Sequence, residues 1–204
     1  MNSFRSNILA ISLFTGFLIV QSGTVCGQAT LGVKAGLNLS NLSLENTSDK
    51  NMVTGLHAGV FLNFPIAEAF SIQPELLFSQ KGTKWDPLES VADAEAKLRQ
   101  SYIDIPVNLV YNLAKDFDFQ LGPYVGFLAR SKLDKEFEND LEKADFNSLD
   151  FGVQGGLRFF LSPVYFGFTY KYGIMRVAKE GKISEDIFGD AANRTIQVYV
   201  ALPF

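Results

Sequence analysis

The chain has 204 residues, enough for one domain with a sizeable core, and its 18 basic and 22 acidic residues give a formal net charge of −4. No Lys/Arg-rich run occurs, so we expect no nucleic-acid partner. Phosphate-loop, Rossmann, nucleophile-elbow and HExxH motifs are absent from the sequence, which argues against the enzyme classes that those motifs identify.

The N-terminal segment has the three parts of a secretory signal peptide. Arg5 lies in a short basic region, an apolar run extends over Ile8–Val20, and small or polar residues follow. We predict cleavage after Gly27, so that residues 1–27 are removed and residues 28–204 form one mature domain. The apolar run is shorter than the ~20 residues that a membrane-spanning helix needs.

The only cysteine, Cys26, lies in the segment that we expect to be removed. The mature chain would then have no thiol and no disulfide. Lipidation of Cys26 is an alternative, which the large Val25 before it disfavours, and cleavage after Ala29 is a second candidate for the processing site.

From residue 30 onward, apolar and polar residues alternate with a period of two, which predicts β-strands with two chemically different faces. Short connections, 65–69, 114–116 and 162–163, alternate with long polar ones. This predicts an antiparallel meander with short turns at one end and long loops at the other. The eight segments are 31–39, 54–64, 70–81, 101–113, 117–127, 149–161, 164–174 and 195–204.

The long connections are expected over residues 42–52, 82–100, 132–147 and 178–193. Two stretches in them, LESVADAEAKL and KEFENDLEKADF, could form short helices, and solvated loops are the alternative. Lysines are interleaved with the acidic residues of the third connection, so a solvated loop of mixed charge is favoured over a cation site or a partner site. These acidic residues are Asp134, Glu136, Glu138, Asp140, Glu142 and Asp145.

Alternation alone does not separate a membrane barrel from a lipocalin-like soluble barrel, because inverting the sheet preserves the pattern. Glycine placement favours the membrane barrel, since glycine makes room inside a narrow tube. Ten glycines fall on the polar face: Gly32, Gly36, Gly55, Gly59, Gly122, Gly126, Gly152, Gly156, Gly167 and Gly173.

The apolar face carries most of the 19 Phe residues, several near strand ends, where the aromatic girdles of a membrane barrel lie. The segments, about 10 to 13 residues long, match the ~9–11 residues of a tilted membrane strand. We therefore predict an all-β protein, an eight-stranded antiparallel up-and-down transmembrane β-barrel in the cell outer membrane.

The segments LGVKAGLNLSNL, FSIQPELLFSQKG, YIDIPVNLVYNL, LGPYVGFLAR and VYVALPF resemble small Gram-negative outer-membrane barrels of the PorT-like, or outer membrane protein beta-barrel domain, family. The resemblance extends over nearly all of the mature chain. It implies an architecture; most members have no assigned activity, and the link of some relatives to protein secretion implies little about function here.

Charged and ionisable side chains also fall on the face that we assign to the lumen. Buried charges are costly unless they are paired, so we expect a hydrogen-bonded network that plugs the lumen. A proton or ion path is the alternative, although an eight-stranded barrel is too narrow for an open pore. The expected members are Lys34, His57, Glu75, Asp104, Arg158 and Lys171.

His57 is the only histidine. A lipid-modifying enzyme would need a serine and a carboxylate beside it and a site that faces the bilayer, whereas we place His57 in the lumen as a structural residue. One histidine and no mature cysteine cannot build a metal cluster. We predict no enzymatic activity, no cofactor and no metal.

The final segment, TIQVYVALPF, places Val200, Leu202 and Phe204 on the apolar face. We expect this strand to pair with the first and close the sheet, so that no edge is exposed. A terminal Phe after alternating apolar residues resembles the signal by which barrel-assembly machinery recognises its substrates.

The function that we predict is that of an integral outer-membrane barrel with a plugged lumen and a structural or binding role through its long extracellular loops. Expected partners are outer-membrane lipids, the barrel-assembly machinery and an envelope or extracellular protein. A soluble lipocalin-like carrier of an apolar ligand is the second hypothesis, and a lipid-modifying barrel enzyme is the third.

Overall fold

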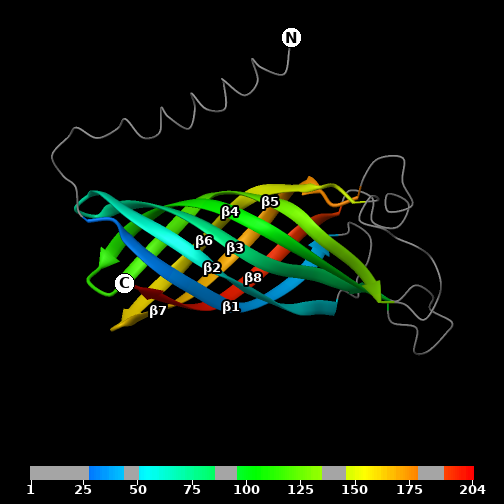
Figure 1. Ribbon diagram of the computed structural model, residues 1–204, viewed down its shortest axis with the longest axis horizontal. Helices are drawn as coiled ribbons and strands as arrows, with labels where there is room; N and C mark the ends of the chain where they lie inside the picture. Colours follow the sequence, from blue (N-terminus) through cyan, green and yellow to red (C-terminus); the bar gives the residue numbers. More distant parts are fainter. Residues whose placement is uncertain (1–27, 44–50, 86–95, 135–145, 179–190) are drawn as a thin grey trace, which may run out of the picture.

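The structure is a computed structural model that describes residues 28–43, 51–85, 96–134, 146–178 and 191–204. Eight antiparallel strands form one closed barrel in which each strand pairs with the next and the last with the first (Figure 1). The predicted fold is therefore confirmed. The strands are β1 (Thr30–Ser43), β2 (Asn51–Ala67), β3 (Phe70–Trp85), β4 (Ala96–Ala114), β5 (Phe117–Asp134), β6 (Leu149–Leu161), β7 (Val164–Arg176) and β8 (Ala192–Pro203).

β8 closes the barrel by pairing with β1 over the whole length of β8. Their register runs from Gly32 opposite Pro203 to Ser43 opposite Ala192, and the backbone N–H of Phe204 donates to the carbonyl oxygen of Leu31 at 2.8 Å. Closure satisfies the backbone groups that an open sheet would leave unpaired.

The two ends of the barrel differ in their connections. Turns of two residues, Glu68–Ala69, Lys115–Asp116 and Ser162–Pro163, join β2 to β3, β4 to β5 and β6 to β7. We call this the short-turn end; it lies at the left of Figure 1, together with the C-terminus. The opposite end is called the long-loop end.

Apolar side chains cover the outside of the barrel, as the alternation predicts. Large residues such as Leu76, Leu121 and Val198 are 50–54 % exposed. Near the short-turn end the register brings aromatic residues side by side, and the rings of Phe70 and Tyr111 stack with their centroids 4.9 Å apart. In the part of the chain that the structure describes, no helix is long and apolar enough to cross a membrane.

Glycines inside the barrel make room for large inward side chains. A Cβ on Gly167 would collide with the ring of Tyr199, and a Cβ on Gly36 would lie 2.6 Å from the Cβ of Tyr199. Tyr199 itself is 3 % exposed. The polar face is thus the crowded inner face, as expected.

The strands are longer than the sequence predicts. β4 has 19 residues and β5 has 18, against the expected 10 to 13, because both continue toward the long loops. Residues 42–43, 51–52, 82–85, 96–100, 132–134 and 192–193, which we assigned to loops, belong to strands. We call the segments 80–85, 96–102 and 128–134 the long-loop extension.

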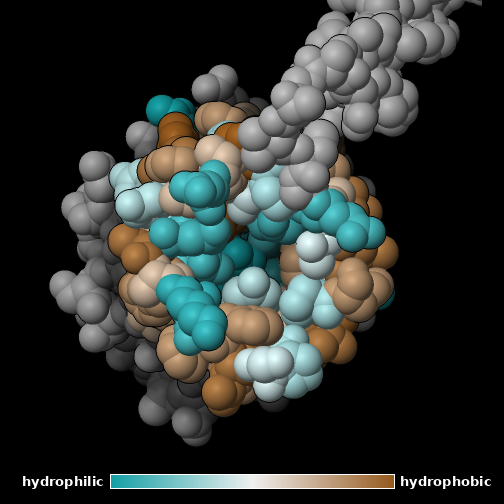
Figure 2. Space-filling view, turned by 90° about the vertical axis from the view of Figure 1, so that its left-hand side faces the viewer, coloured by the Kyte–Doolittle hydropathy of each residue, from teal (hydrophilic) through white to brown (hydrophobic). Residues whose placement is uncertain are grey.

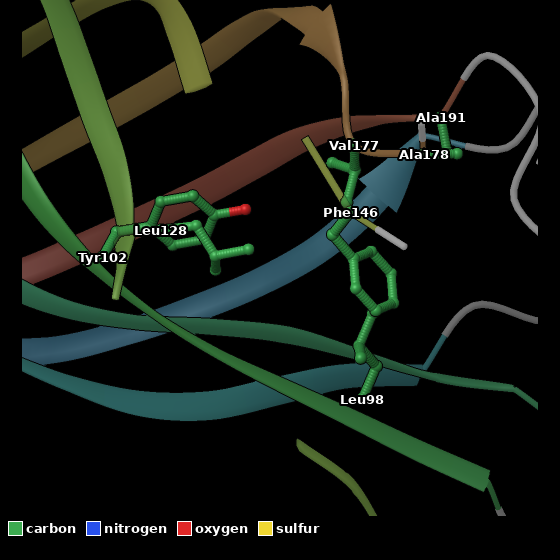
Figure 3. Packing of buried hydrophobic residues seen from close by; sticks show 7 residues of the cluster. All are labelled: Leu98, Tyr102, Leu128, Phe146, Val177, Ala178 and Ala191. Carbon is green, nitrogen blue, oxygen red and sulfur yellow. The ribbon is translucent and has the colours of Figure 1, made fainter. Parts of the chain in front are cut away.

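Inside this end of the barrel a group of apolar side chains packs together, beside the buried polar side chains of Lys81 and Gln100. Figure 3 shows the ring of Phe146 pointing toward Leu98, and Phe146 also forms an isolated backbone bridge with Ala178. Outward positions there are polar, including Gln80, Arg99 and Arg130. We call the inward group the apolar cluster; it consists of Leu98, Tyr102, Leu128, Phe146, Val177, Ala178 and Ala191.

Several expectations fall outside the described residues. The signal peptide 1–27 with Cys26 lies there, as do residues 86–95 and 135–145, which hold most of the two candidate helices and of the acidic cluster. Where the candidate helices reach described residues, 96–98 lie in β4 and Phe146 forms an isolated backbone bridge, so the helical alternative is wrong at these positions.

Candidate functional site: the polar lumen

Toward the long-loop end, two lysines and two aspartates form one connected group in the lumen. Lys81 donates to Asp104 at 3.1 Å and to Asp150 at 2.8 Å. Lys171 donates to the other oxygen of Asp104 at 2.7 Å. Asn193 donates to Asp150 at 3.0 Å. Each carboxylate therefore accepts at least two bonds from donors on other strands, which offsets the cost of its burial.

At mid-height, Lys34 of β1 donates to Glu75 of β3 at 2.9 Å. The second oxygen of Glu75 accepts bonds from Gln73 at 2.8 Å and from Asn108 at 3.0 Å. Lys34 also lies 3.9 Å from the centroid of the Tyr199 ring, within the range of a cation–π contact. Neutral side chains therefore contact both Lys34 and Glu75 and hold this ion pair in place.

Near the short-turn end, Arg158 of β6 bridges the lumen. It donates through Nη2 to Asp118 of β5 at 2.9 Å and through Nη1 to Gln73 of β3 at 2.7 Å. Its guanidinium lies 4.5 Å from the centroid of the Tyr165 ring. The planar guanidinium of an arginine has several N–H donors and can bind acceptors on two strands at once. A lysine, with a single ammonium group, could not reproduce this geometry.

His57 points into the lumen and is 1 % exposed. Its Nδ1 lies 2.7 Å from Oδ1 of Asn38, and Asn38 also accepts a bond from Gln197 at 2.8 Å. The imidazole ring meets the ring of Tyr199 edge-on, with centroids 6.1 Å apart. These contacts tie β1, β2 and β8 together inside the barrel.

Taken together, the described inward side chains are electrically balanced. Four cations are matched by four carboxylates, and all eight residues are at most 7 % exposed. Figure 2 views the short-turn end and shows a hollow with hydrophilic residues around it and hydrophobic residues at the periphery. The cations are Lys34, Lys81, Arg158 and Lys171, and the carboxylates are Glu75, Asp104, Asp118 and Asp150.

The six residues named from the sequence all lie inside the barrel, and Gln73 links Arg158 to Glu75 by hydrogen bonds to both. Lys34 meets Glu75, and Asp104 meets Lys171. Arg158 forms its ion pair with Asp118, and His57 contacts Asn38 and Tyr199.

Three charged members were missed, namely Lys81, Asp118 and Asp150. Each sits at an inward position of a recognised segment, so the period of two carried the signal that would have included them. Their partners depend on the register between strands far apart in the sequence. Among the residues that the structure describes, no group of three or more His, Cys, Asp or Glu side chains is placed to hold a metal ion.

The residues of the expected assembly signal lie on the outer face of β8 and just after it. Val200 is 43 %, Leu202 38 % and Phe204 68 % exposed. Val200 pairs with Ala35 and Leu202 with Val33, both on β1. They therefore belong to the strand pair that closes the barrel.

A closed barrel with charges inside, apolar side chains outside and long loops at one end is the architecture of an outer-membrane β-barrel protein. Residues 20–179 match the family described as outer membrane protein beta-barrel domain. The chain belongs to this family, and it is a protein of the outer membrane. Its closer likeness to PorT-like members stays a prediction.

Solved structures share the fold. One is the crystal structure of Ail, the attachment invasion locus protein of Yersinia pestis, in complex with the heparin analogue sucrose octasulfate. Its sequence is 10 % identical to this chain, the TM-score is 0.50, and the match covers 87 % of this chain and 100 % of that chain. Neisserial surface protein A is 14 % identical, with a TM-score of 0.50 over 87 % and 100 %. At this identity the likeness concerns the fold alone. No curated protein matches the sequence significantly.

The soluble lipocalin-like alternative is wrong. Such a carrier would turn its Phe and Leu side chains inward around a ligand, whereas Phe78, Phe127 and Leu157 are 42–46 % exposed on the outer surface. The family match places the protein in the outer membrane as well.

Proposed function

We propose that the mature chain is an outer-membrane barrel with a plugged lumen, whose structural or binding role is carried by the long connections. The main support for a plugged lumen is that side chains from different strands meet inside it: Lys34 with Glu75, Arg158 with Gln73 and Lys171 with Asp104. The apolar cluster adds a water-excluding layer toward the long-loop end.

Electrical recording tests the plug. The refolded mature protein, inserted into planar lipid bilayers in concentrated potassium chloride, should give no steady conductance. A double variant, Arg158→Ala with Lys171→Ala, removes two side chains that cross the lumen and should open more often, provided that it keeps heat-modifiable mobility on gels. Steady ohmic conductance by the unaltered protein would refute the plug.

The role of the long connections needs a separate experiment. In outer-membrane barrels the short turns face the periplasm and the longer loops face outward, so we orient the long-loop end toward the exterior. A deletion strain would be complemented with the full chain or with a variant in which a Gly/Ser linker replaces residues 135–145. Loss of complementation by a normally assembled linker variant supports a role of this connection, and full complementation contradicts it.

Residues 1–27 are proposed as a removed export signal. Intact-mass measurement of the protein from outer membranes should give a chain that begins at Gln28, or at Thr30 if cleavage follows Ala29. A mature chain that retains Met1 would overturn this proposal.

Recognition of Val200, Leu202 and Phe204 by barrel-assembly machinery is supported by their outward, closing position. Phe204→Asp should lower the amount of heat-modifiable protein in the outer membrane far more than Thr195→Ala, whose side chain faces inward. Equal assembly of the two variants would speak against a role of Phe204.

We expect no enzymatic activity. The hydrogen bond of His57 to Asn38 and its contact with Tyr199 support a structural role. His57→Ala should leave the lipid composition of the outer membrane unchanged. A change in lipid A structure that depends on His57 would favour the enzyme hypothesis instead.

A further inference from the structure

Three buried atoms in the middle of the lumen have no hydrogen-bond partner among the residues that the structure describes. They are Nε2 of His57, Oε1 of Gln154 and Oε1 of Gln197, and the three residues are at most 2 % exposed. Buried polar atoms are nearly always paired, either with protein or with ordered water. We call these atoms the mid-lumen acceptors, because the hydrogen bonds around them leave each with a lone pair and no proton.

Asn38 determines the orientation of two of them. Its Nδ2 donates to the carbonyl oxygen of Gln80 at 2.7 Å, and a carbonyl only accepts, so Oδ1 of Asn38 is the acceptor of this side chain. Nδ1 of His57 and Nε2 of Gln197 both donate to that oxygen, at 2.7 and 2.8 Å. In the neutral imidazole the proton is therefore on Nδ1, and both Nε2 of His57 and Oε1 of Gln197 are acceptors.

The same reasoning applies to Gln154. Nδ2 of Asn108 donates to the carboxylate of Glu75 at 3.0 Å, and Glu75 is ionised because it pairs with Lys34. Oδ1 of Asn108 must then be the atom that accepts from Nε2 of Gln154, at 2.7 Å. Oε1 of Gln154 is left as a third buried acceptor.

Lys171 lies among these acceptors with donors to spare. The register places it directly opposite Gln154 of β6 and diagonally across from Gln197 of β8. An ammonium group has three N–H donors. Within the described part of the chain, Asp104 is the one hydrogen-bond acceptor of Lys171, at 2.7 Å. The middle of the lumen therefore has both spare donors and spare acceptors.

The chemistry of these groups selects a small neutral ligand that both donates and accepts. A cation would meet the ammonium group of Lys171, and an anion would meet the lone pairs of the mid-lumen acceptors. The ligand must also be small, since a Cβ on Gly156 would already lie 2.7 Å from Oγ1 of Thr169. Water fits these conditions, because a buried water makes about three hydrogen bonds to groups of both kinds.

The pattern continues toward the short-turn end. Nε of Arg158 and Oε1 of Gln120 are buried there, and no described residue is a hydrogen-bond partner of either atom. Gln120 is opposite Gly156, two residues from Arg158 along β6. Figure 2 shows the hollow at this end with hydrophilic residues around it. Polar atoms in need of a partner thus extend from the hollow to the middle of the lumen, which gives water a way in.

We propose that the middle of the lumen is a binding site for ordered water. Lys171 donates to a water oxygen, and the bound water donates to the mid-lumen acceptors. The inference rests on the closed lumen of the proposed function and adds that the plug is wet at its middle. Water held by fixed partners satisfies the buried amides and the imidazole, and the ion pairs still close the lumen.

Nuclear magnetic resonance of His57 tests the site, since the chain has a single histidine. The sample is the refolded, untagged mature protein in detergent, labelled with ¹⁵N and ¹³C in histidine and phenylalanine. We expect a neutral ring with its proton on Nδ1 and an Nε2 shift typical of a hydrogen-bond acceptor. Water should transfer magnetisation to the ring protons, with the sign that marks a molecule held for longer than nanoseconds. The ring of Phe146, which is 1 % exposed in the apolar cluster, is the internal control and should receive none.

Gln197→Met removes one acceptor and leaves the exchangeable protons of Lys171 and His57 in place. It should lower the transfer from water to His57 by roughly half or more, because the bound water loses a partner. Gln80→Met makes the same change on the outer face of β3 and should leave the transfer unchanged. Heat-modifiable mobility establishes that each variant is folded before it is measured.

Three results would overturn the proposal: a proton on Nε2, an Nε2 that accepts no hydrogen bond, or an Nε2 that accepts one without transfer from water. The last would assign the bond to a protein donor. Unchanged transfer in Gln197→Met would also overturn it. Failure of the plug is distinguishable, because it would give steady conductance in the bilayer recording and only fast, bulk-like water at His57. Absence of both conductance and transfer would overturn the water site alone.

Discussion

The membrane-facing part of the barrel and the long-loop extension use the same strands with opposite chemistry. On β4, the inward residues Asp104 and Asn108 are polar and the outward Val107 is apolar, whereas nearer the long loops the inward Leu98 is apolar and the outward Arg99 is charged. The strand keeps its alternation without a break. The surroundings, lipid in one case and water in the other, decide which face carries which kind of residue.

The two parts are also held together by different forces. In the membrane-facing part, ion pairs and hydrogen bonds fill the lumen, because lipid already surrounds the apolar side chains and they gain little by turning inward. In the extension, inward apolar side chains are removed from water as in a soluble barrel. We therefore expect the loss of a charge to matter most in the lumen of the membrane-facing part. The loss of apolar volume should matter most inside the extension.

The largest effect is expected at Asp104, which accepts bonds from both Lys81 and Lys171. Asp104→Ala leaves two buried cations without this carboxylate and should lower the free energy of unfolding by about 3–5 kcal/mol, measured by urea titration in lipid vesicles. Asp116→Ala, in an exposed turn, is the control and should change little. An equally small effect at Asp104 would mean that the lumen is hydrated enough to screen its charges.

A slightly smaller loss is expected in the apolar cluster. Leu98 is 0 % exposed and lies against Phe146 (Figure 3). Leu98→Ala should cost about 2–5 kcal/mol, since the enclosed cluster cannot collapse fully onto the cavity. Leu121→Ala on the lipid-facing surface should cost distinctly less in the same titration, because acyl chains fill the space. Equal losses of stability for the two variants would show that Leu98 is packed no more tightly in the apolar cluster than Leu121 is against lipid.

Two positions on the outward face of β3 locate the boundary between the parts. Leu76→Arg places a charge among lipid tails and should cost about 2–4 kcal/mol. Gln80→Arg, four residues closer to the long loops on the same face, should be nearly neutral in vesicles. If both substitutions destabilise equally, the membrane extends further toward the long loops than the chemistry of the surface indicates.

The period of two was sufficient to predict the number of strands and the two faces of each, because both depend on local alternation. The closure of β8 on β1 was expected because a closed sheet leaves no edge exposed. The period of two failed at the strand ends. Leu98 lies just before the expected segment 101–113 and keeps the alternation, but it is apolar on the inward face. A rule that requires apolar residues outside therefore begins this strand too late.

The sequence also predicted which side chains point into the lumen, but not which of them meet there. Inward positions follow from alternation, but partners follow from register: Arg158 and Gln73 are 85 residues apart in the sequence, and only the closed barrel shows that they meet. Lys81 sits at the end of its segment, on the inward face. The apolar cluster joins residues of strands and connections, a combination that no single periodic segment contains.

The smallest effect should come from Gly167, where a large inward side chain crowds the membrane-facing lumen. A Cβ there would collide with the ring of Tyr199, which accepts a bond from Gln120 at 2.6 Å and lies against Lys34. Gly167→Ala should therefore cost about 1–3 kcal/mol in urea titrations, although alanine normally restricts the unfolded chain and stabilises a strand.

Gly155 supplies the matched comparison, because the nearest atom to its added Cβ is Cδ1 of Leu121 at an ordinary 3.4 Å. Gly155→Ala should be neutral or slightly stabilising. The difference between the two substitutions isolates the crowding of the lumen from the general effect of glycine on the chain. If Gly167→Ala were as well tolerated as Gly155→Ala, Tyr199 would have room to move, and its contacts with Gln120 and Lys34 could not be what fixes the lumen at that level.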